Sequence, residues 1–150
     1  MPTNDVSDLS DQDAVDSTHP TLTHVSRVLI IEDAVELADI MRTALKGMNI
    51  LTYHETNGAT ALNTYHKLRP DIVLLDIGLP DMTGWKLLDA IKESQTAARR
   101  PAVVVISAHS DPANRLMGKL QSVYTYLVKP FTLDEVRQIV KQILAEQPAK

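Results

Sequence analysis

The chain contains no cysteine among its 150 residues. This absence excludes disulfides, thiol catalysis and cysteine-ligated zinc. No apolar run approaches the roughly 20 residues that a membrane-spanning helix needs, and the N-terminus lacks the basic and apolar stretches of a secretory signal. The basic residues form no stripe of the kind that binds nucleic acid. We therefore expect a cytoplasmic protein that contacts neither membrane nor nucleic acid directly.

Positive charge is missing from the first 26 residues, which contain five aspartates and no Lys or Arg. This segment is also poor in large apolar residues, so we expect a disordered acidic tail at 1–26. The remainder predicts one domain at 27–146 with a single core and a short C-terminal tail at 147–150. The acidity of the first segment suits either a solubilising leader or a segment that binds a basic partner.

Apolar runs and helical spacing alternate along the rest of the chain. Continuous apolar runs predict buried parallel strands, and the alternation predicts an α/β fold with a doubly wound five-stranded parallel sheet. Asp111-Pro112 and the pair Thr132 and Glu135 mark the starts of the last two helices. The expected strands are 28–31, 50–54, 71–76, 102–106 and 124–128; the expected helices are 34–46, 59–68, 84–93, 111–120 and one that follows Thr132.

Polar residues follow or end four of these strands: Glu32 and Asp33, Asp76, Ser107 and Lys129. The carboxyl ends of parallel strands share one edge of the sheet, so these side chains should converge. Two carboxylates at about 4 Å repel by on the order of 4 kcal/mol at an effective dielectric of 20. A hard divalent cation such as Mg²⁺ would relieve this repulsion. Three carboxylates would then be balanced by the cation and Lys129.

Four motifs at these strand ends resemble the receiver domain of bacterial two-component response regulators. They are Glu32-Asp33, the stretch from Asp76 to Gly84, Ser107-Ala108, and the stretch from Tyr126 to Phe131. The resemblance covers 27–146. It implies a flavodoxin-like (βα)5 fold with strand order 2-1-3-4-5.

The resemblance also implies a role for each matching residue. Asp76 corresponds to the phosphoacceptor. Asp33, Asp76 and the backbone carbonyl of Gly78 correspond to ligands of Mg²⁺, for which Mn²⁺ can substitute. Glu32 corresponds to the second acid, which reaches the metal through water, although as an alternative it could only cap the helix at 34–46.

Further roles concern the phosphoryl group and the response to it. Lys129 corresponds to the lysine that binds a phosphoryl oxygen, and the Lys129–Pro130 bond to one that is cis in the family. Ser107 and Tyr126 correspond to the switch hydroxyl and the switch aromatic; simple packing is the alternative for Tyr126. Gly78 and His109 occupy the positions that tune phosphoryl lifetime, although His109 could also be a solvated loop residue.

The implied function is a phosphorylation-dependent switch that receives its phosphoryl group from a sensor histidine kinase or a histidine phosphotransfer protein. The chain ends about 20 residues after Lys129, so we expect no output domain and action through protein contacts. The implied surface comprises 111–120, 124–128 and the last helix, with an unknown target. We expect no enzyme activity beyond the chain's own phosphoryl transfer and slow autodephosphorylation.

Other functions are compatible with parts of the pattern. A degenerate receiver would act as a scaffold without phosphorylation, and the chain could be a domain of a larger hybrid kinase or regulator. An aspartyl phosphatase would need a second Asp where Gly78 stands, and a flavin-binding protein would need a phosphate loop after the first strand. Ser122-Val123 replaces the Gly-Ala usual in the family, which predicts an altered turn before the last strand.

Overall fold

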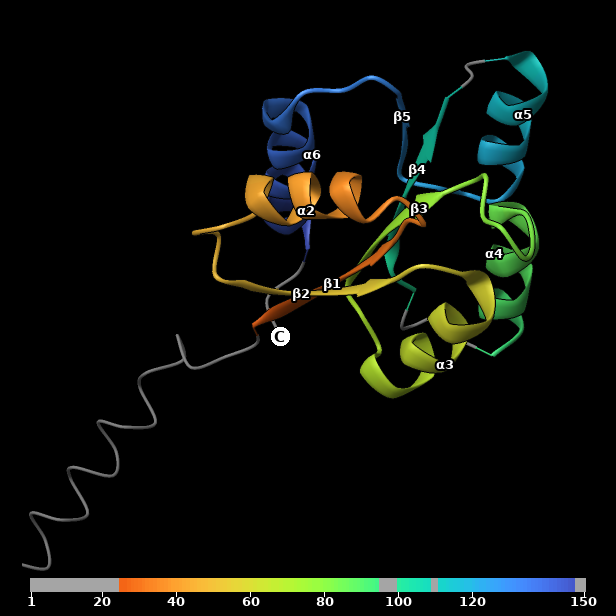
Figure 1. Ribbon diagram of the computed structural model, residues 1–150, viewed down its shortest axis with the longest axis horizontal. Coiled ribbons are helices and arrows are strands. Elements are labelled where there is room, and N and C mark those ends of the chain that lie inside the picture. Colours follow the sequence, from red (N-terminus) through yellow and green to blue (C-terminus); the bar gives the residue numbers. More distant parts are fainter. Residues whose placement is uncertain (1–24, 95–99, 109–110, 148–150) are drawn as a thin grey trace, which may run out of the picture.

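The computed structural model describes residues 25–94, 100–108 and 111–147. Within these ranges five parallel strands form one sheet in the order β2-β1-β3-β4-β5, which confirms the expected fold and strand order (Figure 1). Five helices connect or follow them. The elements are β1 (Ser26–Ile31), α2 (Val35–Ala44), β2 (Ile50–Glu55), α3 (Gly58–Leu68), β3 (Ile72–Asp76), α4 (Gly84–Glu93), β4 (Ala102–Ser107), α5 (Pro112–Leu120), β5 (Thr125–Val128) and α6 (Leu133–Glu146).

The first strand begins two residues earlier than the apolar run suggested. Ser26 and Arg27 continue the ladder by lying opposite Ile50 and Leu51 of β2. Backbone pairing depends little on side-chain polarity, so the hydrophobic pattern of 28–31 could not reveal this extension.

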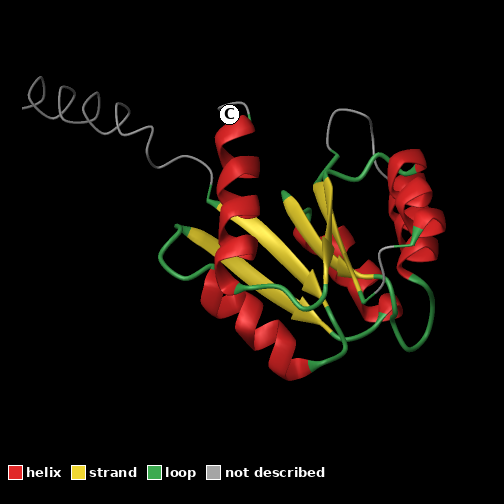
Figure 2. Cartoon of the chain, turned by 90° about the horizontal axis from the view of Figure 1, so that it is seen from above, coloured by secondary structure: helices red, strands yellow, loops and turns green. Residues whose placement is uncertain are grey.

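Helices cover both faces of the sheet, which Figure 2 shows from above. Alternate residues of a strand point to opposite faces. Val28 and Ile30 of β1 therefore pack in the core beneath α2 and α6, whereas Leu29 and Ile31 pack in the core on the side of α3 and α4. No helix in the described ranges combines the length and apolar character needed to span a bilayer.

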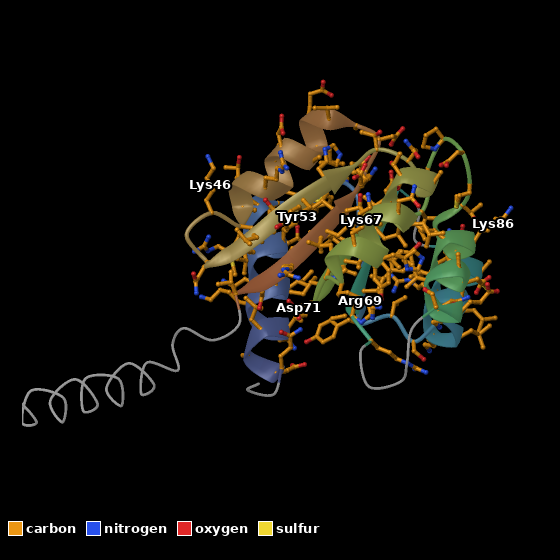
Figure 3. The ribbon with its side chains drawn as sticks, turned by 90° about the horizontal axis from the view of Figure 1, so that it is seen from below. Lys46, Tyr53, Lys67, Arg69, Asp71 and Lys86 are labelled. Carbon is orange, nitrogen blue, oxygen red and sulfur yellow. The ribbon has the colours of Figure 1, made fainter. Side chains whose placement is uncertain are left out.

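Two buried aspartates lie at the two ends of the same segment. Asp71 precedes β3 and Asp76 ends it, and their exposed fractions are 8% and 5%. Asp71 (labelled in Figure 3) accepts the backbone N–H of Arg27 through Oδ2 at 2.9 Å. Its own N–H donates to the Arg27 carbonyl at 2.9 Å. Asp71 therefore joins the starts of β1 and β3.

Candidate functional site

Three carboxylates meet at the carboxyl edge of the sheet. Glu32 and Asp33 follow β1, and Asp76 ends β3. One oxygen of each lies within 4.8 Å of the others. Glu32 and Asp76 are buried, whereas Asp33 is exposed. The sequence prediction that strand ends bring these acids together is confirmed, and one side of the cluster faces solvent.

Lys129 supplies the positive charge of this cluster. Its Nζ lies 3.3 Å from Glu32 Oε1 and 3.4 Å from Asp76 Oδ2. Its backbone N–H donates to the carbonyl of Ser107 at 2.8 Å, which ties the end of β5 to the end of β4. The Lys129–Pro130 peptide bond is cis, the isomer that the resemblance implied.

The two oxygens of Glu32 have different surroundings. Oε2 accepts the N–H of Ala34 at 3.1 Å, at the start of α2. Oε1 is buried, accepts no hydrogen bond from the described residues, and faces Lys129. Ala34 is itself the N-cap residue of α2, and the helix has no side-chain cap hydrogen bond, so Glu32 Oε2 holds the chain just before the helix rather than capping it. The other oxygen lies against the Lys129 amine.

Burial and charge both act on the acid–base properties of the cluster. Burial is the main cause that raises the pKa of Glu32 to about 7, and the negative charge of Asp76 adds to it. Burial alone would lower the pKa of Lys129, but the charges of Glu32 and Asp76 outweigh it and raise that pKa. At neutral pH Lys129 is therefore cationic, while Glu32 is divided between its protonated and ionised forms.

The donor set of this cluster fits a hard divalent cation. All its side-chain donors are carboxylate oxygens, which suit Mg²⁺. Glu32 Oε1 receives no hydrogen bond from the described part of the chain, and Asp33 faces solvent. A divalent cation beside these oxygens would add positive charge that offsets the burial and the Asp76 charge, both of which raise the pKa of Glu32.

The loop between β3 and α4 closes against Asp76. Gly78 donates its N–H to Asp76 Oδ1 at 3.1 Å, and Gly84 donates to the carbonyl of Ile77 at 2.8 Å. Gly78 and Thr83 form an antiparallel bridge. A Cβ on Gly84 would lie 2.9 Å from the Cα of Ile77, so this position has no room for a side chain.

Asp81 in this loop is a residue whose role sequence reasoning missed. Its two oxygens accept the N–H groups of Gly58 and Ala59 at 2.8 Å and 3.0 Å. The residues are 23 and 22 positions apart in the chain. In the sequence, Asp81 follows Pro80 within the motif from Asp76 to Gly84. That motif does not reveal which N–H groups the Asp81 side chain accepts.

Tyr126 of β5 lines a groove next to α5. The guanidinium carbon of Arg115 is 5.4 Å from the centre of its ring, a cation–π arrangement. Tyr126 and six other residues line a groove of about 340 Å³ between α5 and β5: Arg115, Gly118, Lys119, Val123, Tyr124 and Thr125. Ser107 is buried at the end of β4, and His109 lies outside the described residues.

The turn between α5 and β5 contains Ser122 at a φ of 59°, in the left-handed region. Ser122 therefore occupies a left-handed backbone position of the kind that glycine favours.

Residues 28–141 match the family model described as the response regulator receiver domain. The chain belongs to this family. Among curated proteins, this receiver is 32% identical over 129 residues to the regulatory protein AtoC of Escherichia coli, covering 86% of the chain and 27% of AtoC. It is 30% identical over 118 residues to the sporulation initiation phosphotransferase F of Bacillus subtilis, covering 79% of the chain and 93% of that protein.

Solved structures show the same fold. The receiver domain of a LuxO repressor protein from Vibrio parahaemolyticus has a TM-score of 0.75 and 25% identity, over 81% of this chain and 92% of that one. The chemotaxis response regulator CheY4 of Vibrio cholerae has a TM-score of 0.72 and 21% identity, over 80% and 99%. Several relatives are longer regulators; the receiver spans 45% and 56% of two others.

Membership of the receiver family relates the acidic cluster to metal binding. Receiver domains bind Mg²⁺ in an acidic pocket, and in this receiver Glu32, Asp33 and Asp76 form such a cluster. Receiver domains also interact with histidine kinases or phosphotransfer proteins. They are signalling switches rather than enzymes that turn over a substrate.

Proposed function

We propose that Asp76 accepts a phosphoryl group from a histidine kinase or histidine phosphotransfer protein, within a receiver domain at 27–146. The observation that carries this proposal is the cluster at the end of β3. Asp76 is buried there beside two other acids and 3.4 Å from the amine of Lys129. The match to a sporulation phosphotransferase over 93% of its length supports it.

The transfer requires a nucleophile and a place for the charge of the phosphoryl group. A carboxylate oxygen of Asp76 attacks the phosphorus of a phosphohistidine. The O–P bond forms and the P–N bond breaks, and its electron pair returns to the imidazole nitrogen, which takes a proton from water. Two groups are close enough to orient the carboxylate: the N–H of Gly78 at Oδ1 and the amine of Lys129 at Oδ2.

Mg²⁺ would be held by Asp33, Asp76 and the carbonyl of Gly78, with Glu32 beside it, and when bound it would neutralise negative charge on the phosphoryl oxygens. Lys129 would turn from Glu32 and Asp76 to a phosphoryl oxygen. A compact ammonium with rotatable donors suits this change of partner.

The response would pass from Ser107 to Tyr126. Ser107 ends β4, next in the sheet to β5, and Tyr126 lies opposite Val105 of β4. We assign them the switch roles of the family, with phosphorylation shifting an equilibrium between two arrangements. The groove between α5 and β5, together with exposed Leu116 and Leu120 of α5, supports an output surface for protein contacts formed by α5, β5 and α6.

Intact mass spectrometry after incubation with acetyl phosphate and Mg²⁺ tests the proposal. We expect one phosphoryl adduct on the wild-type protein and none on Asp76→Asn or after chelation of the metal. Asp71→Asn is the matched control, because Asp71 is buried on the same segment but outside the cluster, and it should be labelled like wild type. If wild type takes no adduct and beryllofluoride does not stabilise it, phosphorylation-independent scaffolding is the better function.

A further inference from the structure

The carboxylate of Asp81 connects the phosphorylation loop to a separate helix. Oδ1 accepts the N–H of Gly58 and Oδ2 that of Ala59, and these are the first two residues of α3. The first N–H groups of a helix have no partner within it, and its dipole favours negative charge there. The bond from Gly58 is the main reason that the pKa of Asp81 is lowered.

The helix has a cap of its own, so it does not depend on Asp81 for one. Asn57 is the N-cap residue, and its Oδ1 accepts the N–H of Thr60 at 3.0 Å. The two side chains thus bind different N–H groups of the same helix end. Asn57 belongs to the helix boundary, whereas Asp81 belongs to the loop that follows Asp76.

A second contact holds the same part of the loop on α3. A Cβ on Gly58 would lie 2.6 Å from both Cγ and Sδ of Met82. Met82 therefore rests directly on bare backbone at the start of the helix. The polar contact of Asp81 and the apolar contact of Met82 fix neighbouring residues against one site.

The other end of the loop is fixed at the phosphorylation site. The bond from Gly84 to Ile77 and the bridge between Gly78 and Thr83 close its base. Gly78 also binds Asp76 Oδ1 through its N–H. The loop thus has a closed base at the cluster and a tip attached to α3.

We propose that Asp81 is a positioning residue for phosphorylation: by attaching the loop to the start of α3, it holds the Gly78 backbone in place for the metal and for Asp76. This inference rests on the proposed phosphoryl transfer at Asp76. The hydrogen bonds of the Asp81 side chain go to α3 rather than to the three acids. It acts through the loop, as residues that orient metal ligands commonly do.

Calorimetric titration of the full chain with Mg²⁺, combined with phosphorylation rates from acetyl phosphate, tests this role. In Asp81→Ala the Kd for Mg²⁺ should rise roughly tenfold, a typical effect of losing a group that orients a metal ligand. The phosphorylation rate should fall at limiting Mg²⁺ and recover largely at saturating Mg²⁺, because the carboxylates remain. Asp81→Asn keeps one acceptor and should give an intermediate Kd; it also serves if the alanine variant folds poorly.

Asn57→Ala is the matched control, because it removes the other side-chain partner of the same helix end. It should lower the Tm as Asp81→Ala does, yet leave the Kd for Mg²⁺ at the wild-type value. A wild-type Kd in both Asp81 variants, or an equal rise in Asn57→Ala, would overturn the positioning role and leave Asp81 as a helix cap. Absence of Mg²⁺ binding and of an adduct on wild type would instead overturn the proposed function.

Discussion

Asp71 and Asp76 stand five positions apart in the sequence and are both buried, but their surroundings are opposite. Asp71 lies at the amino edge of the sheet and accepts the backbone N–H of Arg27. Asp76 lies at the carboxyl edge beside Glu32 and Asp33, with Lys129 as the nearby cation. Asp71 joins two strands, whereas Asp76 belongs to a cluster in which negative charges outnumber positive ones.

This difference separates a structural acid from a reactive one. A buried carboxylate that accepts backbone N–H groups stabilises the fold. A buried carboxylate among other carboxylates raises the free energy of the fold until a cation or a change of protonation compensates. Burial is the main cause that raises the pKa of Glu32 to about 7, and the charge of Asp76 adds to it. Additional positive charge would therefore stabilise the cluster around Asp76, whereas Asp71 already has a backbone N–H as its partner.

The largest expected effect concerns the protonation of Glu32. Its folded pKa of about 7 exceeds the ordinary value of 4.5, so the folded state binds the proton more tightly than the unfolded state. This contribution to stability is complete below pH 4.5 and is lost as the pH rises through 7. The difference between the two pKa values implies a contribution to the free energy of unfolding of about 3 kcal/mol at low pH.

Urea denaturation at a series of pH values, with chelator present, measures this contribution. The free energy of unfolding of wild type should fall relative to that of Glu32→Gln as the pH rises from 4.5 to 7. The introduced amide retains an oxygen for the Ala34 N–H, so the comparison isolates the titration. Parallel pH profiles for the two proteins would mean that Glu32 ionises as an ordinary carboxylate.

The next effect is the response of stability to Mg²⁺. Free Mg²⁺ at about a hundred times its Kd should stabilise wild type by about 2.7 kcal/mol. Asp33→Asn should reduce this gain to below about 1 kcal/mol at the same concentration, because an exposed ligand has been removed. Thermal or urea denaturation with and without Mg²⁺ measures both gains, and equal gains would show that Asp33 is not a ligand.

Asp71 should affect stability without affecting the site. Asp71→Ala leaves the N–H of Arg27 without its carboxylate acceptor, which should cost about 2 kcal/mol. Asp71→Asn keeps an acceptor and should cost less. Urea denaturation gives these values, and the stabilisation by Mg²⁺ should stay at the wild-type value in both variants. A loss of the Mg²⁺ effect in Asp71→Asn would break the distinction between the two aspartates.

The smallest effect has the opposite sign. Asp76→Asn removes two repulsions, from Glu32 and Asp33, and one attraction, to Lys129. The metal-free protein should therefore become more stable by about 1 kcal/mol at low ionic strength. The measurement is urea denaturation with chelator present. A loss of stability similar to that of Asp71→Ala would place Asp76 among the structural acids.

Much of the fold was readable because its strands are continuous apolar runs that must be buried on both faces. The runs at 28–31, 71–76 and 102–106 each became a central strand. The site was readable for a related reason: polar residues directly after such runs must emerge at one edge. Strand order came from the resemblance to receivers, since the alternation of elements alone permits several orders.

What could not be predicted depends on contacts between distant residues. The bonds from Gly58 and Ala59 to Asp81 join segments more than 20 residues apart, and no local pattern encodes them. The burial that raises the pKa of Glu32 and the cation–π contact of Arg115 with Tyr126 likewise follow from packing. The sequence indicated which residues gather, and the structure shows which partner each atom has.

Mapping the phosphorylated residue distinguishes the two aspartates most directly. After incubation with acetyl phosphate and Mg²⁺, borohydride reduction converts an aspartyl phosphate to homoserine. The tryptic peptide that ends at Lys86 contains Asp71, Asp76 and Asp81, and fragment masses tell them apart. We predict homoserine at position 76 and at neither of the other two. Homoserine at 71, at 81 or at position 33 would contradict the assignment of Asp76 as the phosphoacceptor.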